Sequence, residues 1–382
     1  MDIYIISERI SPFIGGTETR WHEIGKRLAN KGHKITFITG RGDITLKYPK
    51  PELYKQNEII DGYSIKRIYD FKNSNIEAGT RGMMNCINFG IHSGLFIERL
   101  KSKIDLDIID VNIYPHLHLP FYKLFNSSPN VVTWHEVWKN EWRKRSGLLK
   151  IGKELEQLNA QIGEHVIGVS KYTLNRLKHI RRKNNNFHLV ENGINEKFFK
   201  RKIKNKDVPR LLFVGRLTPD KNPHTILLKS FKRLIKTYPT ATLDIVGTGP
   251  LASIIENKIK TLSNIKYHGE LKMNVLLDLF ELCNIFVLPS KREGLSIVSR
   301  EANAVGLPVI TINYPTNAAA FETIINGYNG YVSNEKDFTD KIILAFKNID
   351  DLERNSKKEA SKYHWDNIIP NLETVYRLAM EK

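Results

Sequence analysis

Two glutamates, Glu293 and Glu301, stand eight residues apart in a stretch that reads as a loop running into a helix. Eight residues of helix rise by about 12 Å, so two carboxylates at this spacing can contact an extended ligand at two points. The N–H groups at a helix start, together with the helix dipole, favour an anion between them. That anion would lie against the residues of the turn, Gly294, Leu295 and Ser296.

Two cations earlier in the chain suit the same kind of ligand. Arg216 and Lys221 stand five residues apart in an expected loop that follows an apolar strand at residues 211–214. A guanidinium offers a planar fork of donors and an ammonium offers a point charge, so the pair suits a diphosphate. Taken without their surroundings, the same two residues would be ordinary surface cations.

The elements expected around these residues belong to a parallel α/β sheet. The apolar runs at residues 285–288 and 309–312 are typical of strands, and the helical pattern between them covers residues 297–305. Gly306 and Pro308 end that helix. Further strands are expected at residues 2–7, 34–39, 63–69, 107–111, 130–133, 165–170, 189–194, 241–246 and 264–271. Strand–helix–strand repeats build parallel sheets, whose ligands bind at the carboxyl ends of the strands.

Six short segments, taken in order, resemble the motifs of one enzyme family. They are GGTE at 15–18, WHE at 134–136, ENGI at 191–194, GRLTPDK at 215–221, GTGP at 247–250 and E-x₇-E at 293–301. Together they are similar to the motifs of retaining glycosyltransferases of family 4, which have the GT-B fold. The resemblance spans nearly the whole chain, and the joint match is far more specific than any single motif.

The resemblance implies an α/β protein with two Rossmann-like domains that face each other across a cleft. Residues 1–200 would form the acceptor-side domain, and a C-terminal helix at about 366–382 would pack back on it. Residues 207–365 would form the nucleotide-sugar-binding domain, with the basic stretch 200–209 as a linker. The segment 364–379 is expected to form a pair of helices.

The resemblance also assigns roles to single residues. In the family, the first glutamate of the motif contacts the transferred sugar and the second contacts the ribose, which here would be Glu293 and Glu301. An arginine and a lysine at the spacing of Arg216 and Lys221 bind the donor diphosphate. A histidine at the strand end occupied by His135 contacts the donor sugar or lies near the acceptor, although a lone histidine is otherwise more often structural.

Several glycines are implied to approach the nucleotide. Gly247 and Gly249 correspond to a G-x-G-P turn that lies beside it in the family. Gly15 and Gly16, together with Glu18, correspond to a loop near the cleft. From the residues alone, two glycines before a helix suit a phosphate, and a tight strand-to-helix turn would explain them equally well.

The implied activity is transfer of a hexose-type sugar, with retention of configuration, from a UDP- or GDP-type sugar nucleotide to a glycan or lipid-linked acceptor. No further cofactor is expected, and no credible metal motif is present, so the two cations would take the role of a metal ion at the leaving diphosphate. An epimerase of nucleotide sugars with the same fold, or a non-catalytic nucleotide-sugar-binding protein, is the alternative. The stretch 313–320 departs from the glycine-rich loop common in the family, which leaves the donor sugar open.

Asp105 and Asp107 form a D-x-D pattern, which binds a metal ion in glycosyltransferases of another fold. Here the pattern stands directly before an apolar strand, so we interpret it as a turn. The two cysteines, Cys86 and Cys283, have no motif spacing and are expected to be buried thiols.

The composition fits a globular protein with a basic surface. The 382 residues are 41% hydrophobic and carry a net charge of +18. Such a charge favours anionic partners such as nucleotide phosphates and lipid headgroups, or it reflects an ordinary lysine-rich surface. The sequence contains no recognised nucleic-acid-binding motif, so nucleic acid is not an expected partner.

The segment 137–153 mixes tryptophans with lysines and arginines. This composition suits a helix lying on anionic lipid, and a solvated basic helix with an apolar stripe is the alternative. The chain starts without a recognisable leader and has no apolar run of about 18 residues. We therefore expect a cytoplasmic protein that can associate peripherally with the inner membrane face.

Overall fold

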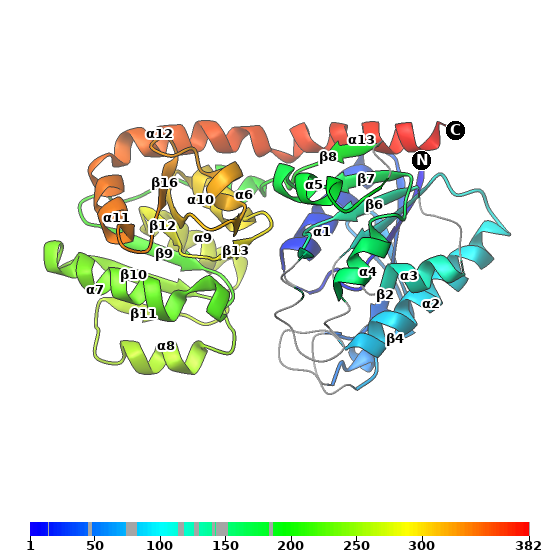
Figure 1. Ribbon diagram of the computed structural model, residues 1–382, viewed down its shortest axis with the longest axis horizontal. Helices are drawn as coiled ribbons and strands as arrows, with labels where there is room; N and C mark the ends of the chain where they lie inside the picture. Colours follow the sequence, from blue (N-terminus) through cyan, green and yellow to red (C-terminus); the bar gives the residue numbers. More distant parts are fainter. Residues whose placement is uncertain are drawn as a thin grey trace. The chain divides into compact units, whose positions relative to one another are not determined.

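The computed structural model describes residues 1–13, 15–44, 48–73, 82–113, 118–125, 130–139, 142, 152–182 and 186–381. The chain forms two compact units, and Figure 1 labels many of their elements. The first unit comprises Met1–Glu191 and Ile368–Lys382, and the second comprises Asn192–Asn367.

The first unit is built on an eight-stranded sheet with the order β3-β4-β2-β1-β5-β6-β7-β8. Neighbouring strands are parallel, except for the antiparallel edge pair of β3 and β4. The strands are β1 Asp2–Ile6, β2 Lys34–Arg41, β3 Asn57–Ile60, β4 Tyr63–Asp70, β5 Ile108–Ile113, β6 Val131–Trp134, β7 His165–Gly168 and β8 Phe187–Leu189. The helices are α1 Gly16–Asn30, the 3₁₀ turn η1 Pro51–Leu53, α2 Met83–Lys101, α3 His118–Leu124, α4 Gly152–Asn159, α5 Lys171–Lys178 and most of α13 Trp365–Met380.

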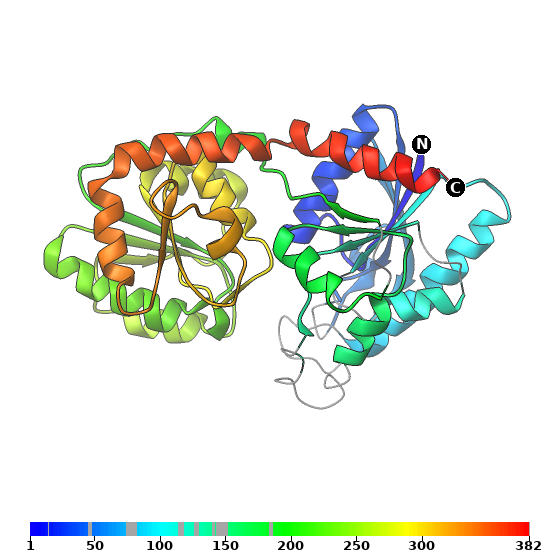
Figure 2. The ribbon, with the colours of Figure 1, turned by 45° about the horizontal axis from the view of Figure 1, so that its top comes forward.

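Because successive side chains of a strand point to opposite faces, the two faces of this sheet pack against different helices. In β5, Ile109 points into a core that it shares with α2 and α3. The next residue, Asp110, points to the opposite face, where its carboxylate accepts a hydrogen bond of 2.9 Å from the Tyr376 hydroxyl of α13. Phe37 of β2 contacts Trp21 of α1, with ring centroids 6.2 Å apart. Helices α1 and α13 therefore cover the face away from α2 and α3, as Figure 2 shows.

The second unit is built on a six-stranded parallel sheet with the order β11-β10-β9-β12-β14-β16. This is the order of a Rossmann-type sheet, in which the direction of winding reverses between β9 and β12. The strands are β9 Arg210–Val214, β10 Thr242–Val246, β11 Ile265–Tyr267, β12 Ile285–Leu288, β14 Val309–Ile312 and β16 Gly330–Ser333, with a separate two-stranded ribbon of β13 Arg292–Glu293 and β15 Thr316–Asn317. The helices are α6 Glu196–Phe199, η4 Pro219–Lys221, η5 Pro223–Leu227, α7 Leu228–Thr237, α8 Ala252–Ile259, α9 Met273–Leu282, α10 Ile297–Val305, η6 Ala319–Thr323, α11 Phe338–Lys347, α12 Ile349–Ala360 and η7 Ser361–Tyr363.

Helices cover both faces of the second sheet. Side chains of α7, α8 and α11 pack in one core, and side chains of α6, α9 and α10 pack in another. Figures 1 and 2 show α7 and α8 on one side of the strands, with α9 and α10 on the other. The prediction of an α/β protein with two Rossmann-like parallel sheets is therefore confirmed.

The stretch around the two glutamates has the elements that its sequence predicts. The strands β12 and β14 and the helix α10 have the expected bounds. The Ser296 side chain caps α10 by accepting a hydrogen bond of 3.3 Å from the Ser299 N–H. Gly306 ends the helix in the left-handed region, with φ of 109°.

Two segments of the second unit differ from the expectation. The stretch 200–209 is packed against the unit instead of forming a linker, because Ile203 is 8% exposed and the Lys204 N–H donates to the Glu281 carbonyl at 2.9 Å. The strand expected at 264–271 is short, because β11 ends at Tyr267 and Gly269 turns the chain with φ of +65°.

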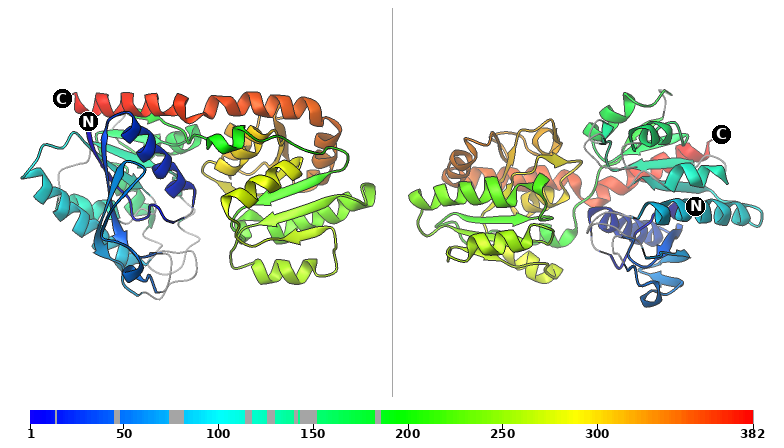
Figure 3. Two further views of the ribbon diagram at one scale, coloured as in Figure 1. Left: turned by 180° about the vertical axis from the view of Figure 1, so that it is seen from behind. Right: turned by 60° about the horizontal axis from the view of Figure 1, so that its bottom comes forward.

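The C-terminal segment forms one helix, α13, and the prediction of a helix pair there was wrong. Pro370 lies inside this helix and cannot donate the usual backbone hydrogen bond. Buried Ile369, Leu372 and Tyr376 hold the helix in place across the proline. Figure 3 shows α13 in red, and residues 368–382, which contain most of it, belong to the first unit.

Candidate functional site

The candidate site lies in the second unit, where three loops leave the carboxyl ends of β9, β10 and β12. Because β9 and β12 are neighbours at the reversal point of the sheet, their loops emerge side by side. The loop after β9 carries Arg216 and Lys221, and the loop after β12 carries Glu293. This edge of the sheet is the place where doubly wound folds bind ligands.

The loops after β9 and β10 are joined along their backbones. The Leu217 N–H donates to the Thr248 carbonyl at 2.8 Å, and the Leu251 N–H donates to the Leu217 carbonyl at 3.0 Å. A Cβ atom at Gly247 would lie 2.0 Å from the Gly215 carbonyl oxygen, where the backbone also has φ of +127°. A Cβ atom at Gly249 would lie 2.6 Å from the Leu217 carbonyl oxygen. Both glycines are therefore needed to let the Arg216 loop approach closely.

Lys221 and Glu293 are brought into direct contact. The Lys221 Nζ lies 2.6 Å from the Glu293 Oε1 and donates a second hydrogen bond of 3.1 Å to the Arg292 carbonyl. Both side chains are 12% exposed. The pair thus connects the loop after β9 with the loop after β12 in a partly desolvated position, where charge interactions are stronger than at an open surface.

Positive charge gathers around this pair. Burial alone would raise the pKa of the Asp220 carboxyl, but the Thr218 hydroxyl and the charges of Lys221, Arg292 and Arg216 together lower it. The Asp220 carbonyl also accepts a hydrogen bond of 2.7 Å from the Lys291 N–H. Arg216 itself is exposed. The three cations make this edge attractive to an anion.

Glu301 lies in α10, four residues after the first residue of the helix. The turn Gly294–Ser296 precedes the helix, so Glu301 is about 6 Å along the axis from its start and not the two turns first expected. Burial raises the pKa of Glu301 to about 7. Among the described residues Glu301 has no hydrogen-bond or ion-pair partner, so its carboxylate is available to a ligand.

The segment 313–320 lies directly beside Glu293. Its strand β15 pairs with β13, with Thr316 opposite Arg292 and Asn317 opposite Glu293. The Ala318 N–H donates to the Glu293 carbonyl at 2.9 Å. The stretch whose sequence is unusual therefore fixes the backbone of the first glutamate.

The remaining predicted site residues lie in the first unit. Gly15 has extended backbone and its carbonyl accepts from the Thr19 N–H at 2.9 Å, while Gly16 begins α1. Glu18 is buried and pairs with Arg9 at 2.9 Å.

His135 follows β6 and is 9% exposed. Its carbonyl accepts a hydrogen bond of 3.3 Å from the Thr173 hydroxyl of α5. This contact fixes the backbone at the strand end.

Two functional candidates were missed in the sequence. Arg292 adds a third cation, and its only sequence signal was its position next to Glu293. Asn222 has left-handed backbone with φ of 52°, and its side-chain amide donates to the Pro289 carbonyl at 2.9 Å. This further connection between the loops after β9 and β12 depends on a long-range contact that no local pattern shows.

Two further predictions concern Asp107 and the cysteines. Asp107 accepts a hydrogen bond of 2.7 Å from the Asp2 N–H, a structural role that agrees with its interpretation as a turn residue. Across the described residues, no three His, Cys, Asp or Glu side chains are arranged to hold a metal ion. Cys86 and Cys283 are both buried, as predicted.

The basic segment at 137–153 lies mostly outside the described residues, which include only 137–139, 142 and 152–153 of it. Within the part of the chain that the structure describes, no helix is both long enough and apolar enough to span a membrane.

Two known families match successive parts of the chain. The family described as "Glycosyltransferase Family 4" matches residues 14–198, and the family described as "Glycosyl transferases group 1" matches residues 194–363. The two matches together cover all six of the predicted motifs.

Individual proteins show the same likeness. An uncharacterized glycosyltransferase of Methanocaldococcus jannaschii is 24% identical over 96% of this chain and 95% of its own length. A GDP-mannose-dependent monoacylated alpha-(1-6)-phosphatidylinositol monomannoside mannosyltransferase of Corynebacterium glutamicum is 30% identical over 50% of this chain and 52% of its own. In structure, a sucrose-phosphate synthase of Thermosynechococcus elongatus superimposes with a TM-score of 0.77 at 18% identity, covering 98% of both chains, and this likeness concerns the fold.

Proposed function

Because the chain belongs to the glycosyltransferases of group 1 and family 4, with the GT-B fold and a nucleotide-sugar donor, we propose that it moves a hexose-type sugar with retention of configuration. The proposed acceptor is a glycan or a lipid-linked sugar. The name of the Corynebacterium relative describes a lipid-linked acceptor and a GDP-linked hexose, which supports both parts of the proposal.

The observation that carries the proposal is the contact between Lys221 and Glu293 at the reversal point of the second sheet. Transfer breaks the bond between the anomeric carbon and the diphosphate, so negative charge grows on the leaving phosphate. Lys221 and Arg216 would stabilise that charge, because fixed cations in a partly desolvated site interact strongly with a developing anion. They would thereby supply the neutralisation that a metal ion gives in other transferases.

The two glutamates would hold the other ends of the donor. Glu293 would accept hydrogen bonds from the transferred sugar, and Glu301 would accept them from the ribose. The carboxylate of Glu301 has no hydrogen-bond or ion-pair partner among the described residues, so it can accept hydrogen bonds from a ligand. The turn Gly294–Ser296 and the start of α10 would face the phosphates.

We assign the remaining residues by their units. In the first unit, His135 is proposed to contact the donor sugar or to lie near the acceptor, and Gly15 and Gly16 are proposed to approach the phosphates of the nucleotide. Gly247 and Gly249 are proposed to border the nucleotide, since their close approach fixes the Arg216 loop. The acceptor oxygen would attack the anomeric carbon on the face that the diphosphate leaves, which retains its configuration.

A donor screen tests the proposal. The melting temperature of the protein would be followed with UDP-, GDP-, ADP- and TDP-sugars, because a ligand of the native state raises it. We expect one nucleotide class to raise the melting temperature and its sugar to appear on an added acceptor or in water. An epimerised nucleotide sugar with no transfer would instead indicate an epimerase, and binding without any turnover would indicate a non-catalytic protein.

A further inference from the structure

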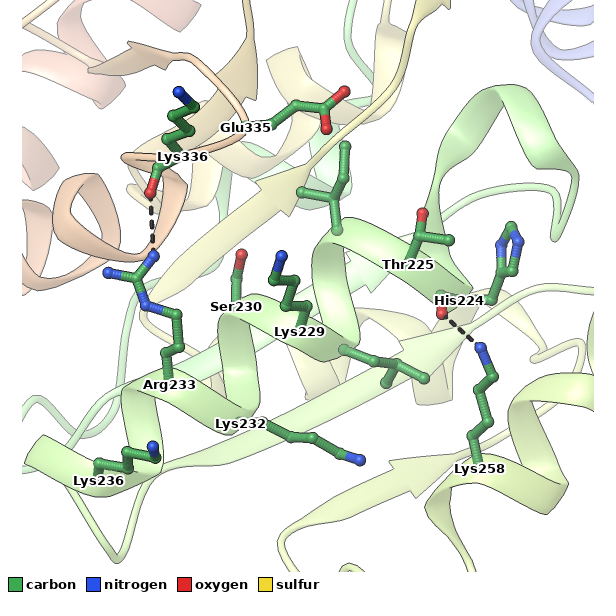
Figure 4. Close-up of a pocket in the computed structure, with 12 residues that line it drawn as sticks. His224, Thr225, Lys229, Ser230, Lys232, Arg233, Lys236, Lys258, Glu335 and Lys336 are labelled. Carbon is green, nitrogen blue, oxygen red and sulfur yellow. Dashed lines mark hydrogen bonds between the residues drawn. The ribbon is translucent and has the colours of Figure 1, made fainter.

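The second unit has a hollow of about 990 Å³ beside α7 that the proposed transfer reaction does not use. It is formed by the π-helical turn η5, α7, one residue of α8 and the loop after β16 (Figure 4). The residues that line it are His224, Thr225, Ile226, Leu228, Lys229, Ser230, Lys232, Arg233, Lys236, Lys258, Glu335 and Lys336. Half of these twelve side chains are lysine or arginine.

The cations come from three separate elements. On α7, the four positions 229, 232, 233 and 236 follow the spacing that places side chains along one helix face. Figure 4 shows the Lys258 side chain of α8 extending toward the His224 carbonyl. Lys336, in the loop before α11, turns its carbonyl toward Arg233 and its ammonium away from α7. All six cationic side chains are exposed to solvent.

The positive charge of this hollow is poorly balanced by the protein itself. Lys229, Lys232 and Lys236 have no hydrogen-bond or ion-pair partner among the described residues. Like charges at such helical spacing repel one another and destabilise the helix. The hollow contains one acid, Glu335, and its carboxylate accepts a hydrogen bond from the Tyr314 hydroxyl.

The walls are held together by two hydrogen bonds. The Lys258 ammonium donates to the His224 carbonyl at 3.1 Å, and the Arg233 guanidinium donates to the Lys336 carbonyl at 3.0 Å. Arg233 is also 3.6 Å from Asp340. These contacts connect α8 with η5, and the loop after β16 with α7, so the elements that carry the cations are joined around the hollow.

The lining selects among anionic partners. It has no aromatic ring other than His224, so nucleic-acid bases would find little to stack on. Its two aliphatic residues, Ile226 and Leu228, are buried at 8% and 4% exposure, so they cannot anchor in a bilayer, and a hollow does not match a flat membrane. The lining contains a row of positive charges about 10 Å long on α7, with further positive charges from α8 and from the loop after β16.

We propose that this hollow binds an anionic glycan, a carbohydrate chain that carries carboxylate, phosphate or sulfate groups. The proposal rests on the proposed function, in which the enzyme extends or modifies a glycan. His224 follows Lys221 by only three residues, so the hollow begins next to the candidate donor site within the same unit. A second contact with the glycan would raise the effective concentration of acceptor ends near the enzyme.

Binding of a fluorescent oligogalacturonate to the full-length protein tests the proposal. A variant with three changes in the hollow, called the groove variant, would carry K229E, K232E and K236E. The control would carry K272E, K347E and K358E, three exposed lysines outside the hollow with the same total charge change. We expect the groove variant to bind the oligosaccharide on the order of tenfold more weakly than the control, since three exposed ion pairs are lost together. Binding should also weaken with added salt and be absent for neutral dextran.

Several results would overturn the proposal: no binding of the acidic oligosaccharide, equal losses in the groove and control variants, or tighter binding of single-stranded DNA or anionic vesicles than of the glycan. Nucleotide-sugar binding is measured in parallel, because the groove variant should keep it unchanged. Loss of glycan binding with intact donor binding would show that the hollow binds the glycan independently of the donor site. Absence of donor binding in every form, the wild type included, would instead contradict the proposed function.

Discussion

At the scale of the residue, the site depends on contacts between side chains that stand far apart in the sequence. Lys221 and Glu293 are 72 positions apart and yet 2.6 Å from each other. The sequence predicted a role for each of them separately, but their contact could not be read from it, because it follows from the adjacency of β9 and β12. Arg292 was missed for the same reason.

Glu301 gives a residue-scale prediction about pH. Burial raises the pKa of Glu301 to about 7 in the ligand-free protein, and only the ionised carboxylate is a pure acceptor for ribose hydroxyls. Below this pH a proton must leave before the nucleotide binds, so affinity should fall about fourfold as pH drops from about 8 to 6.5. Isothermal titration with the nucleoside diphosphate over this range measures the effect.

Glu301→Gln is the matched control for that titration. The amide does not ionise, so the variant should bind more weakly at pH 8 and show a flatter pH profile. Subtracting its profile also removes any contribution from titration of the phosphate itself. Parallel profiles for the two proteins would contradict contact between Glu301 and the nucleotide.

At the scale of the element, the bounds of β12, α10 and β14 followed from local signals. An apolar run, a serine cap and a glycine stop were enough to place them. Local sequence signals gave the wrong prediction where tertiary packing determines the structure. The basic stretch 200–209 contributes Ile203 to the core, and α13 continues through Pro370. In both cases burial of apolar side chains outweighs a local preference that points the other way.

The packing of the loops after β9 and β10 yields an element-scale prediction. Gly247→Ala should lower the free energy of unfolding by about 2–4 kcal/mol, because the new Cβ would meet the Gly215 carbonyl in a strained backbone region. Gly327→Ala, where φ is +80° but the nearest atom is 4.0 Å away, should lower it by only about 1 kcal/mol. Urea denaturation measures both values. Equal losses in the two variants would show that the close approach at Gly247 adds nothing.

At the scale of the whole molecule, the helix α13 packs on the first unit although most of that unit comes from residues 1–191. Tyr376 of α13 and Thr133 of β6 both donate to the Asp110 carboxylate, and Lys31 and His33 pair with Glu373. Burial raises the pKa of Asp110 to about 6, although the hydrogen bonds from Tyr376 and Thr133 oppose the shift. Contacts that hold this unit together therefore come from segments far apart in the sequence.

The order of motifs along the whole chain was sufficient to predict the family and the two Rossmann-like sheets, because several motifs, such as those at 134–136, 215–221 and 247–250, stand at strand ends. The basic hollow beside α7 could not be predicted. Its lysines are unremarkable in sequence, and only the folding of η5, α7 and the loop after β16 places them around one space.

The central claim is that fixed cations at the reversal point of the second sheet stabilise the leaving diphosphate, and the turnover of Lys221→Ala tests it most directly. With the donor found in the screen, we predict a fall in kcat on the order of 10²-fold, as for loss of one group that stabilises transition-state charge. Lys291→Ala, which removes an exposed lysine near the same loop, should keep nearly full activity, and both variants should remain folded. Turnover by folded Lys221→Ala equal to that of the wild type would contradict the account.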